Sequence, residues 1–420
     1  MKVLERTKGL RALLSKHDFR RLVVSQLFGG MGEWLATLAL IALVWDRTHS
    51  AVASGIVLAL RILPAALVGG ALAAVVDRFD RKRVLIACTL GRALIYGALP
   101  LIGGVAPVLG LALVAEVTTL AYMAARDATL PRLVESTHLT SANAISVLST
   151  FGAMPVGSGL FAGLVWLQGR LFSPGQAFAF IAASGLLFAA TVQLRHIKAA
   201  SSVPVPAADS PVQTEQQGTM KLREIFRADP ILRRVAIGGL IVACSGGVLI
   251  TLGLAYVRET LHAGSAAYSG LMTSFALGAA VGVGAVQKAR AQLPRLFHLG
   301  SVAMGAILLS MALFPSAGVG FGMSFVFGGA AVATFLGGIT ILQDRVHDCA
   351  RGRAFAIAHC SLRVIAVAVG LLAAYIAHLL RHGIWRLDGT QIVLGFAGLV
   401  LVVAGVMLVR PARRALPASA

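Results

Sequence analysis

Apolar residues in this chain are gathered into long runs that short charged segments separate. Each run has about 20 residues, the length that an α-helix needs to cross the hydrocarbon core of a bilayer. A membrane β-barrel would instead show shorter segments of alternating polarity. The pattern therefore predicts an all-α membrane protein whose helices satisfy their own backbone hydrogen bonds. Twelve transmembrane helices are expected, at residues 20–44, 52–76, 84–104, 106–126, 141–167, 174–195, 231–257, 266–287, 296–315, 317–342, 354–380 and 388–409.

The predicted helices divide into two halves of six. Residues 199–220 form the one long polar stretch, and their Pro, Ser and Gln content is typical of a flexible linker. The segments SAVASG (50–55) and SAAYSG (265–270) are similar, and each opens an even-numbered helix that ends in a basic loop. A parallel repeat of six helices is one of the known transporter architectures. We expect one six-helix bundle with a basic cytoplasmic N-terminus at 1–198 and a second, with a short cytoplasmic C-terminus, at 221–420.

Composition and charge agree with this pattern. Hydrophobic residues make up 57% of the chain and charged residues 13%, which excludes a soluble domain of this length. The net charge of +20 would suggest a nucleic-acid partner in a soluble protein. Here most Lys and Arg residues fall in alternate loops, so the positive-inside rule explains the charge and places both termini in the cytoplasm. The expected environment is a lipid bilayer, without nucleic acid.

Five charged side chains lie well inside predicted helices, away from both ends, where charge is costly and usually has a function. They are Glu33, Arg61, Arg92, Glu116 and Arg363. A carboxylic acid in a low-dielectric site favours its neutral form, and a nearby arginine favours the charged form. Glu33 lies near the predicted bilayer midplane and is expected to be the main protonation site, with Glu116 second. The alternative is that each acid sits in a fixed ion pair that holds the helices together.

The arginines and Trp34 complete this set of cavity candidates. Arg61 and Arg92 would be counter-charges or anchors for an anionic substrate, and Arg363 would join them if it lines the same cavity. Trp34 adjoins Glu33 and could stack on a planar substrate, or pack against neighbouring helices. A small molecule is the expected substrate, and the proton is the expected coupling ion.

The charged segment AAVVDRFDRKRVL (73–85) resembles a motif of a known family. Members of the major facilitator superfamily carry the loop G-x-x-x-D-R-x-G-R-R between helices two and three. Here Asp77 occupies the aspartate position, and Ala73 and Asp80 stand at the two glycine positions. The form Asp-Arg-x-Asp-Arg is similar to that of bacterial enterobactin exporters and macrolide efflux proteins. Three further segments resemble the same branch, at residues 19–34, 125–146 and 342–356.

The resemblance implies a fold and a function. The fold is that of a monomer in the bacterial inner membrane, in which two six-helix bundles rock about a central site. The function is proton-coupled export of a small amphiphilic molecule, drug-like or siderophore-like, as in antiporters of multidrug resistance. The alternatives are an importer or facilitator of an anionic metabolite, a lysophospholipid flippase of the same fold, and a membrane enzyme or sensor.

The resemblance also suggests a conformational latch. Asp77 would end the second helix and dock on the N-terminal end of helix eleven near Gly352 and Arg353, where the helix dipole is positive. Arg78 and Arg81 belong to the same charged loop. This contact would hold the cytoplasmic side closed, and its loss would favour an inward-open state. A simpler interpretation of the basic residues is that they anchor the loop on the cytoplasmic side.

The segment GAMPVGSGLFAG (152–163) loosely resembles the glycine and proline motif of antiporters in the superfamily. Pro155 removes one backbone hydrogen bond and is expected to kink the helix. Four glycines of this helix, Gly152, Gly157, Gly159 and Gly163, are expected to permit close packing against a neighbouring helix, with Gly152 and Gly159 as the main candidates.

Enzymatic motifs are not found in the sequence. It has no phosphate-binding loop with a Walker lysine and no HExxH pair. Its four cysteines are scattered without a CxxC spacing, so they predict neither a disulfide framework nor a metal site. We therefore expect a transporter without enzymatic activity, cofactor or metal ion.

Overall fold

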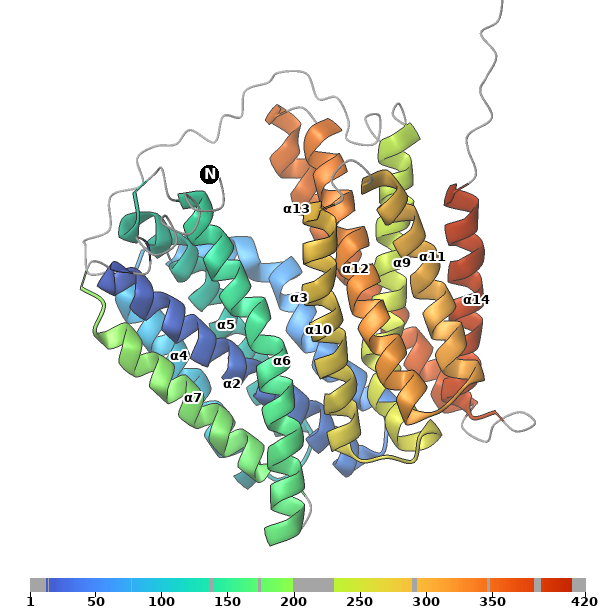
Figure 1. Cartoon of the computed structure of the whole chain (residues 1–420). Coiled ribbons are helices and arrows are strands. Elements are labelled where there is room, and N and C mark those ends of the chain that lie inside the picture. Colours follow the sequence, from blue (N-terminus) through green and yellow to red (C-terminus); the bar gives the residue numbers. More distant parts are fainter. Residues whose placement is uncertain are drawn as a thin grey trace, which may run out of the picture. The chain divides into compact units, whose positions relative to one another are not determined.

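Within the residues that the structure describes, the chain forms twelve long α-helices in a computed structural model (Figure 1). The described residues are 13, 15–76, 78–135, 139–172, 175–198, 230–288, 293–345, 348–380 and 387–409. The helices are α2 (His17–Thr48), α3 (Ala51–Val76), α4 (Arg81–Ala98), α5 (Ala106–Leu133), α6 (Leu139–Leu171), α7 (Ala177–Arg195), α9 (Pro230–Ala255), α10 (Ser265–Lys288), α11 (Leu293–Leu313), α12 (Ala317–Arg345), α13 (Asp348–Leu379) and α14 (Gly389–Val409). A 3-10 turn, η1 (Leu99–Leu101), follows α4, and a π-helical turn, η3 (Tyr256–Thr260), extends α9. The predicted all-α fold with twelve helices is confirmed.

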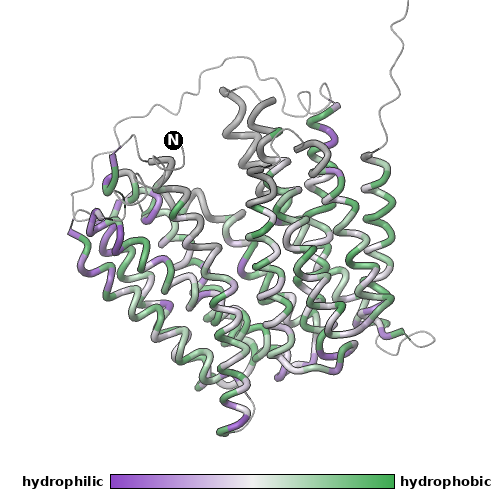
Figure 2. The backbone as a smooth tube through the Cα atoms, in the orientation of Figure 1, coloured by the Kyte–Doolittle hydropathy of each residue, from purple (hydrophilic) through white to green (hydrophobic). Residues whose placement is uncertain are grey.

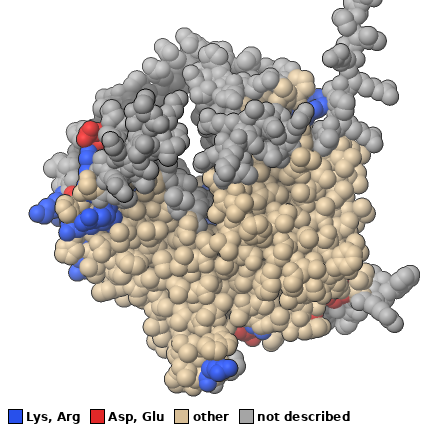
Figure 3. Space-filling model, in the orientation of Figure 1, with Lys and Arg blue, Asp and Glu red and all other residues tan. Residues whose placement is uncertain are grey.

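The described helices have the apolar character of membrane spans. Nine of them are long and apolar enough to cross a bilayer within their described residues, and shorter apolar helical stretches lie at Ala51–Ile62 and Phe297–Leu313. Figure 2 shows hydrophobic residues along the helices and hydrophilic residues concentrated toward their ends. On the face drawn in Figure 3, uncharged residues cover the middle, and the described Lys and Arg side chains lie near the ends of the helices. This distribution fits a chain that lipid surrounds.

The observed helices extend beyond the apolar runs that predicted them. α2 covers His17–Thr48, whereas its apolar run covers 20–44, and α6 covers Leu139–Leu171, whereas its run covers 141–167. Hydropathy marks only the part of a helix that faces lipid or the core. Polar residues at both ends continue the helical hydrogen bonding into the aqueous boundary, so the observed ends lie further out.

Asp80 determines where the third helix begins. Its backbone is extended, and its Oδ1 accepts a hydrogen bond of 2.8 Å from the backbone N–H of Arg83. This N-cap satisfies one of the donors that the first turn of a helix leaves unpaired. Arg81, the first residue of α4, donates from Nη1 to the carbonyl oxygen of Ala128 in α5 at 2.8 Å. The helix therefore begins at Arg81, earlier than predicted, and Asp80 has a local role that glycine lacks the side chain to fill.

The chain divides into two compact units. The first contains Met1–Gln217 and His262–Ala276, and so includes α2 to α7 and the first half of α10. The second contains Gly218–Leu261 and Leu277–Ala420. In the first unit α2 packs against α6, and α4 packs against α5 and α7. In the second, α9 packs against α13, and α11 packs against α12 and α14. Counted along each half, these are the same pairs of helices, as expected for an internal repeat.

One glycine in each unit permits a close approach between the paired helices. A Cβ atom added at Gly157 in α6 would lie 2.8 Å from the carbonyl oxygen of Met31 in α2. A Cβ atom at Gly370 in α13 would lie 2.7 Å from the carbonyl oxygen of Gly247 in α9. Both distances are too short for a carbon atom, so each position requires glycine. The fifth helix of each half thus approaches the first helix of that half in the same way.

The other residues singled out in α6 have different surroundings. A Cβ atom at Gly152 or Gly159 would meet no described atom within 4 Å. The close approach expected of α6 therefore takes place at Gly157. Pro155 lies inside α6, and the helix continues past it to Leu171.

We predict that Gly157→Val lowers the free energy of unfolding by about 1–3 kcal/mol, because the added side chain must push α6 away from α2. Thermal unfolding of the purified protein in detergent would measure this effect. Gly159→Val is the matched control, since it lies in the same helix with open space around it. Equal loss of stability in both variants would contradict the assignment.

Candidate functional site

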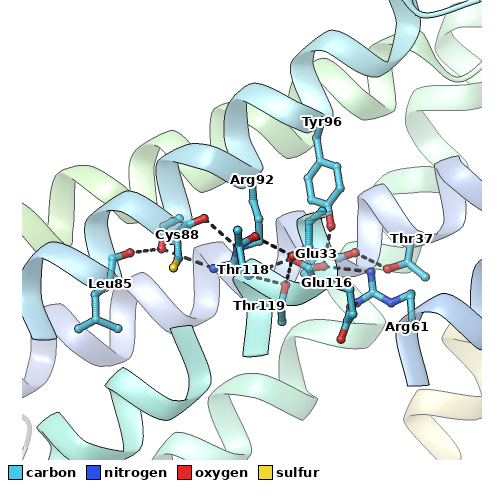
Figure 4. Close-up of polar contacts among 12 residues, drawn as sticks. Glu33, Thr37, Arg61, Leu85, Cys88, Arg92, Tyr96, Glu116, Thr118 and Thr119 are labelled. Carbon is cyan, nitrogen blue, oxygen red and sulfur yellow. Dashed lines mark hydrogen bonds and ion pairs between the residues drawn. The ribbon is translucent and has the colours of Figure 1, made fainter. Parts of the chain in front are cut away.

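Four charged side chains from four successive helices meet in the interior of the first unit (Figure 4). They are Glu33 in α2, Arg61 in α3, Arg92 in α4 and Glu116 in α5. Arg61 Nη1 lies 3.0 Å from Glu33 Oε1, and Arg92 Nη1 lies 3.0 Å from Glu33 Oε2. Arg61 Nη2 lies 3.8 Å from Glu116 Oε2. The structure thus brings together four of the five charged residues that the sequence places well inside helices; we call these four the charge cluster.

The carboxylate of Glu33 is the centre of this cluster. Its Oε1 accepts hydrogen bonds from Arg61 and from the hydroxyl of Tyr96, the latter at 2.7 Å. Its Oε2 accepts from Arg92. Hydrogen bonds between charged groups are shorter and stronger than neutral ones, so this carboxylate joins three helices. Thr37, one turn further along α2, donates to the carbonyl oxygen of Glu33 at 2.6 Å and leaves the carboxylate to its three donors.

Arg92 is held by several groups besides Glu33. Its Nε donates to the carbonyl oxygen of Cys88 at 3.3 Å, and Nη1 donates to the hydroxyl of Thr119 at 3.3 Å. The guanidinium carbon lies 4.9 Å from the centre of the Tyr122 ring, a distance typical of a cation–π interaction. Only 4% of the side chain is exposed. Arg92 is therefore held in place by uncharged groups of α4 and α5 in addition to Glu33.

Arg61 has a different environment. Its ion pairs are with the two acids, Glu33 and Glu116. Its side chain is 22% exposed, more than that of Glu33, Glu116 or Arg92. The guanidinium group therefore lies between two carboxylates and at the accessible edge of the cluster.

Tyr96 is a member of the site that the sequence analysis did not identify. It is 2% exposed and donates to Glu33 from one helical turn beyond Arg92. The only sequence signal is this spacing, which places residues 92 and 96 on the same face of α4. A tyrosine in an apolar span carries no charge, so hydropathy does not mark it as unusual.

The remaining predicted site residues lie elsewhere. Trp34 is partly buried and lies in the contact between α2 and α6. A Cβ atom added at Gly157 in α6 would lie 2.9 Å from the Cβ atom of Trp34. This position favours packing over stacking on a substrate. Arg363 is an exposed residue of α13 and belongs to the second unit. Among the described residues, no group of three His, Cys, Asp or Glu side chains could hold a metal ion.

The residues of the predicted latch are only partly described. Asp77 lies outside the described residues, and Arg78 is exposed in the turn before α4. Gly352 and Arg353 lie within α13, which begins at Asp348, and the surroundings of both residues are outside what the structure describes. The contact between Asp77 and helix eleven therefore stays a prediction from the sequence.

The family model of the Major Facilitator Superfamily matches residues 22–370. The chain belongs to the Major Facilitator Superfamily. It is therefore a multi-pass membrane protein of a family of transporters, whose substrates are small molecules. The match includes all four members of the charge cluster. No curated protein sequence matches the chain.

Solved structures with the superfamily fold resemble this chain over almost its whole length. A bacterial homolog of the human lysosomal transporter Spinster, in an inward-facing and unoccupied conformation, has a TM-score of 0.69 at 14% identity and covers 94% of this chain and 95% of its own. The nucleoside transporter NupG has a TM-score of 0.69 at 14% identity, with 93% and 98% covered. A POT peptide transporter has a TM-score of 0.69 at 12% identity, and the match covers 93% of this chain and 93% of its own. At these identities the likeness concerns the fold alone.

We predict that Arg92→Gln lowers the free energy of unfolding of this superfamily member by about 3 kcal/mol, because it leaves a buried acid short of a positive charge. Unfolding in mixed detergent micelles would measure the loss. The double variant Glu33→Gln with Arg92→Gln should recover much of it, since it removes the uncompensated charge. A double variant that is less stable than Arg92→Gln alone would contradict the pairing.

Proposed function

We propose that the protein is a secondary active transporter driven by protons, with Glu33 as the protonation site. One observation carries this proposal: the buried carboxylate of Glu33 accepts hydrogen bonds from Arg61, Arg92 and Tyr96 at once. A proton that binds there removes the charge with which both arginines are paired. Protonation is thereby coupled to the way in which α2, α3 and α4 are held together.

The charge balance of the cluster suits this coupling. Two acids and two arginines give a net charge of zero, so the cluster can exist in a low-dielectric interior without an external ion. A proton on Glu33 leaves one positive charge in excess. The conformational state that best relieves this excess is then favoured, and the equilibrium between states depends on the proton. In alternating access, the same group loads a proton on one side of the membrane and releases it on the other.

We further propose that transport is export of a small amphiphilic molecule, drug-like or siderophore-like, across a bacterial inner membrane with both termini in the cytoplasm. The support is the resemblance of the loop at residues 77–83 and of three other segments to bacterial exporters, together with the distribution of Lys and Arg. Neither the charge cluster nor the fold depends on direction, so export rests on the resemblance.

A second candidate is transport of an anionic metabolite, and one observation favours it. Arg61 is the most exposed member of the charge cluster and carries a guanidinium group, which binds carboxylates and similar anions through paired hydrogen bonds. An anion that pairs with Arg61 would replace the charge that Glu33 loses on protonation. The proton and the anion would then bind together. Inward movement of the proton down its gradient would drive import of the anion.

We predict that Glu33→Gln reduces proton-driven transport to the level of liposomes without protein, because glutamine cannot take up or release a proton. The assay is accumulation of a panel of amphiphilic compounds in proteoliposomes with an imposed pH gradient, with and without a protonophore. Glu135→Gln is the matched control, since Glu135 is an exposed acid paired with Lys16. Full activity of Glu33→Gln would remove Glu33 from the proton path.

The two substrate candidates differ in their dependence on Arg61. If the substrate is an anion, Arg61→Gln should weaken binding of an aromatic sulfonate by about tenfold or more and leave its neutral sulfonamide unchanged, because a charge-assisted hydrogen bond contributes about 1.5–3 kcal/mol. Ligand-induced thermal stabilisation in detergent would measure both affinities. Equal effects on the sulfonate and the sulfonamide would contradict the anionic candidate.

A further inference from the structure

Protonation of Glu33 removes the negative charge with which both Arg61 and Arg92 are paired. The two arginines differ in the other groups that contact them. We propose that Arg61 is the charge that moves: it transfers from Glu33 to Glu116, while Arg92 stays in place. This inference rests on the proposed role of Glu33 as a protonation site. It assigns α3 as the helix that responds to the proton and makes Glu116 the acceptor of Arg61.

Arg92 keeps most of its contacts when Glu33 becomes neutral. The carbonyl oxygen of Cys88 and the hydroxyl of Thr119 accept from its guanidinium group, and the ring of Tyr122 lies against it. None of these groups loses its acceptor character when Glu33 is protonated. The face of an aromatic ring also stabilises a cation directly. Tyr122 is thus a positioning residue that holds Arg92 while its acidic partner is neutral.

Arg61 depends on charge to a much greater degree. One guanidinium nitrogen lies 3.0 Å from Glu33 and the other 3.8 Å from Glu116, so the group already bridges the two acids. Loss of the charge on Glu33 leaves Glu116 as the stronger partner. A small displacement brings this second ion pair to hydrogen-bonding distance. Because the Arg61 side chain is partly exposed, the displacement does not require a close-packed core to open.

The helix that carries Arg61 lacks one backbone hydrogen bond close to this residue. Pro64 lies inside α3, one turn beyond Arg61. Proline has no backbone N–H, so the carbonyl oxygen of Leu60 lacks its usual helical donor. Helices bend readily where such a bond is missing. α4 has no proline between Arg81 and Ala98, so the two arginines are carried by helices of different stiffness.

Among the described residues of the elements that pack around Glu33, no ionisable group outside the charge cluster forms an ion pair with Arg61. α6 and α7 also pack against α2, but their only ionisable residues are Arg170 and Arg195, each in the last turn of its helix. α3 carries Arg61 as its only charged residue. The groups that face the centre of the cluster are then the four charged residues together with Tyr96, and Tyr122 lies behind Arg92. Exchange between Glu33 and Glu116 is the rearrangement that this set permits.

The test compares the movement of α3 with that of α4. Spin labels are attached to cysteines at the exposed positions Leu67 in α3 or Leu94 in α4, each paired with Phe188 in α7. The background replaces the native cysteines Cys88, Cys244, Cys349 and Cys360. In proteoliposomes we expect the 67–188 distance to shift by a few ångström between alkaline and acidic buffer and the 94–188 distance to stay constant. Glu33→Gln should hold the acidic 67–188 distance in both buffers.

A charge-conserving variant tests the role of Glu116 separately. Glu116→Asp keeps the negative charge but withdraws the carboxylate by one methylene group, so Arg61 can no longer reach it. We expect this variant to keep the alkaline 67–188 distance in both buffers and to lose proton-driven transport. Glu135→Asp, the same change at an exposed acid, should behave as the parent protein.

Two outcomes separate this inference from the proposed function. If Glu33→Gln abolishes proton-driven transport but the 67–188 distance does not respond to pH, Glu33 remains the protonation site and the exchange of Arg61 is wrong. A shift of the 94–188 distance without one at 67–188 would also overturn it, since Arg92 would then be the moving charge. Full transport by Glu33→Gln would instead overturn the proposed function.

Discussion

A charge inside a membrane protein must be compensated by another charge, and in the first unit two acids and two arginines do this around the carboxylate of Glu33. Glu33 accepts hydrogen bonds from two arginines and a tyrosine, which come from two other helices. Removing one member of a buried ion pair lowers the free energy of unfolding by more than the intact pair contributes to it. The reason is that the remaining charge stays buried in a low-dielectric environment without a partner. The arrangement of α2, α3, α4 and α5 is therefore tied to the state of one acid.

The two arginines share this acid but are not equivalent. Arg92 lies among hydroxyl and carbonyl oxygens and against the ring of Tyr122, and these partners persist whatever the state of Glu33. Arg61 lies between two acids, so its position depends on their relative charge. A cluster with one fixed and one exchangeable cation can convert a proton into a change of helix contacts. The proposed coupling to protons depends on this difference between the two arginines.

The repeat within the chain supplies the frame for this site. The fifth helix of each half approaches the first through a glycine, Gly157 in one unit and Gly370 in the other. Among the described residues, the charge cluster belongs to the first unit. The ionisable members of the cluster come from α2 to α5, and Arg363 of the second unit is exposed. The charge cluster of the first unit is therefore built on a packing scheme that both units share.

The sequence by itself determined the number of helices, their approximate spans and the candidates for the charge cluster. These follow from local properties, since an apolar run of sufficient length spans a bilayer and a charge within it is costly wherever its partner lies. Three features could not be predicted from hydropathy or charge: the cap that Asp80 provides, the hydrogen bond from the Tyr96 hydroxyl, and which of the four glycines at 152–163 makes the close contact. Only the tertiary structure decided which arginine is fixed and which one bridges two acids. That distinction depends on distances between helices far apart in the chain, which no single segment encodes.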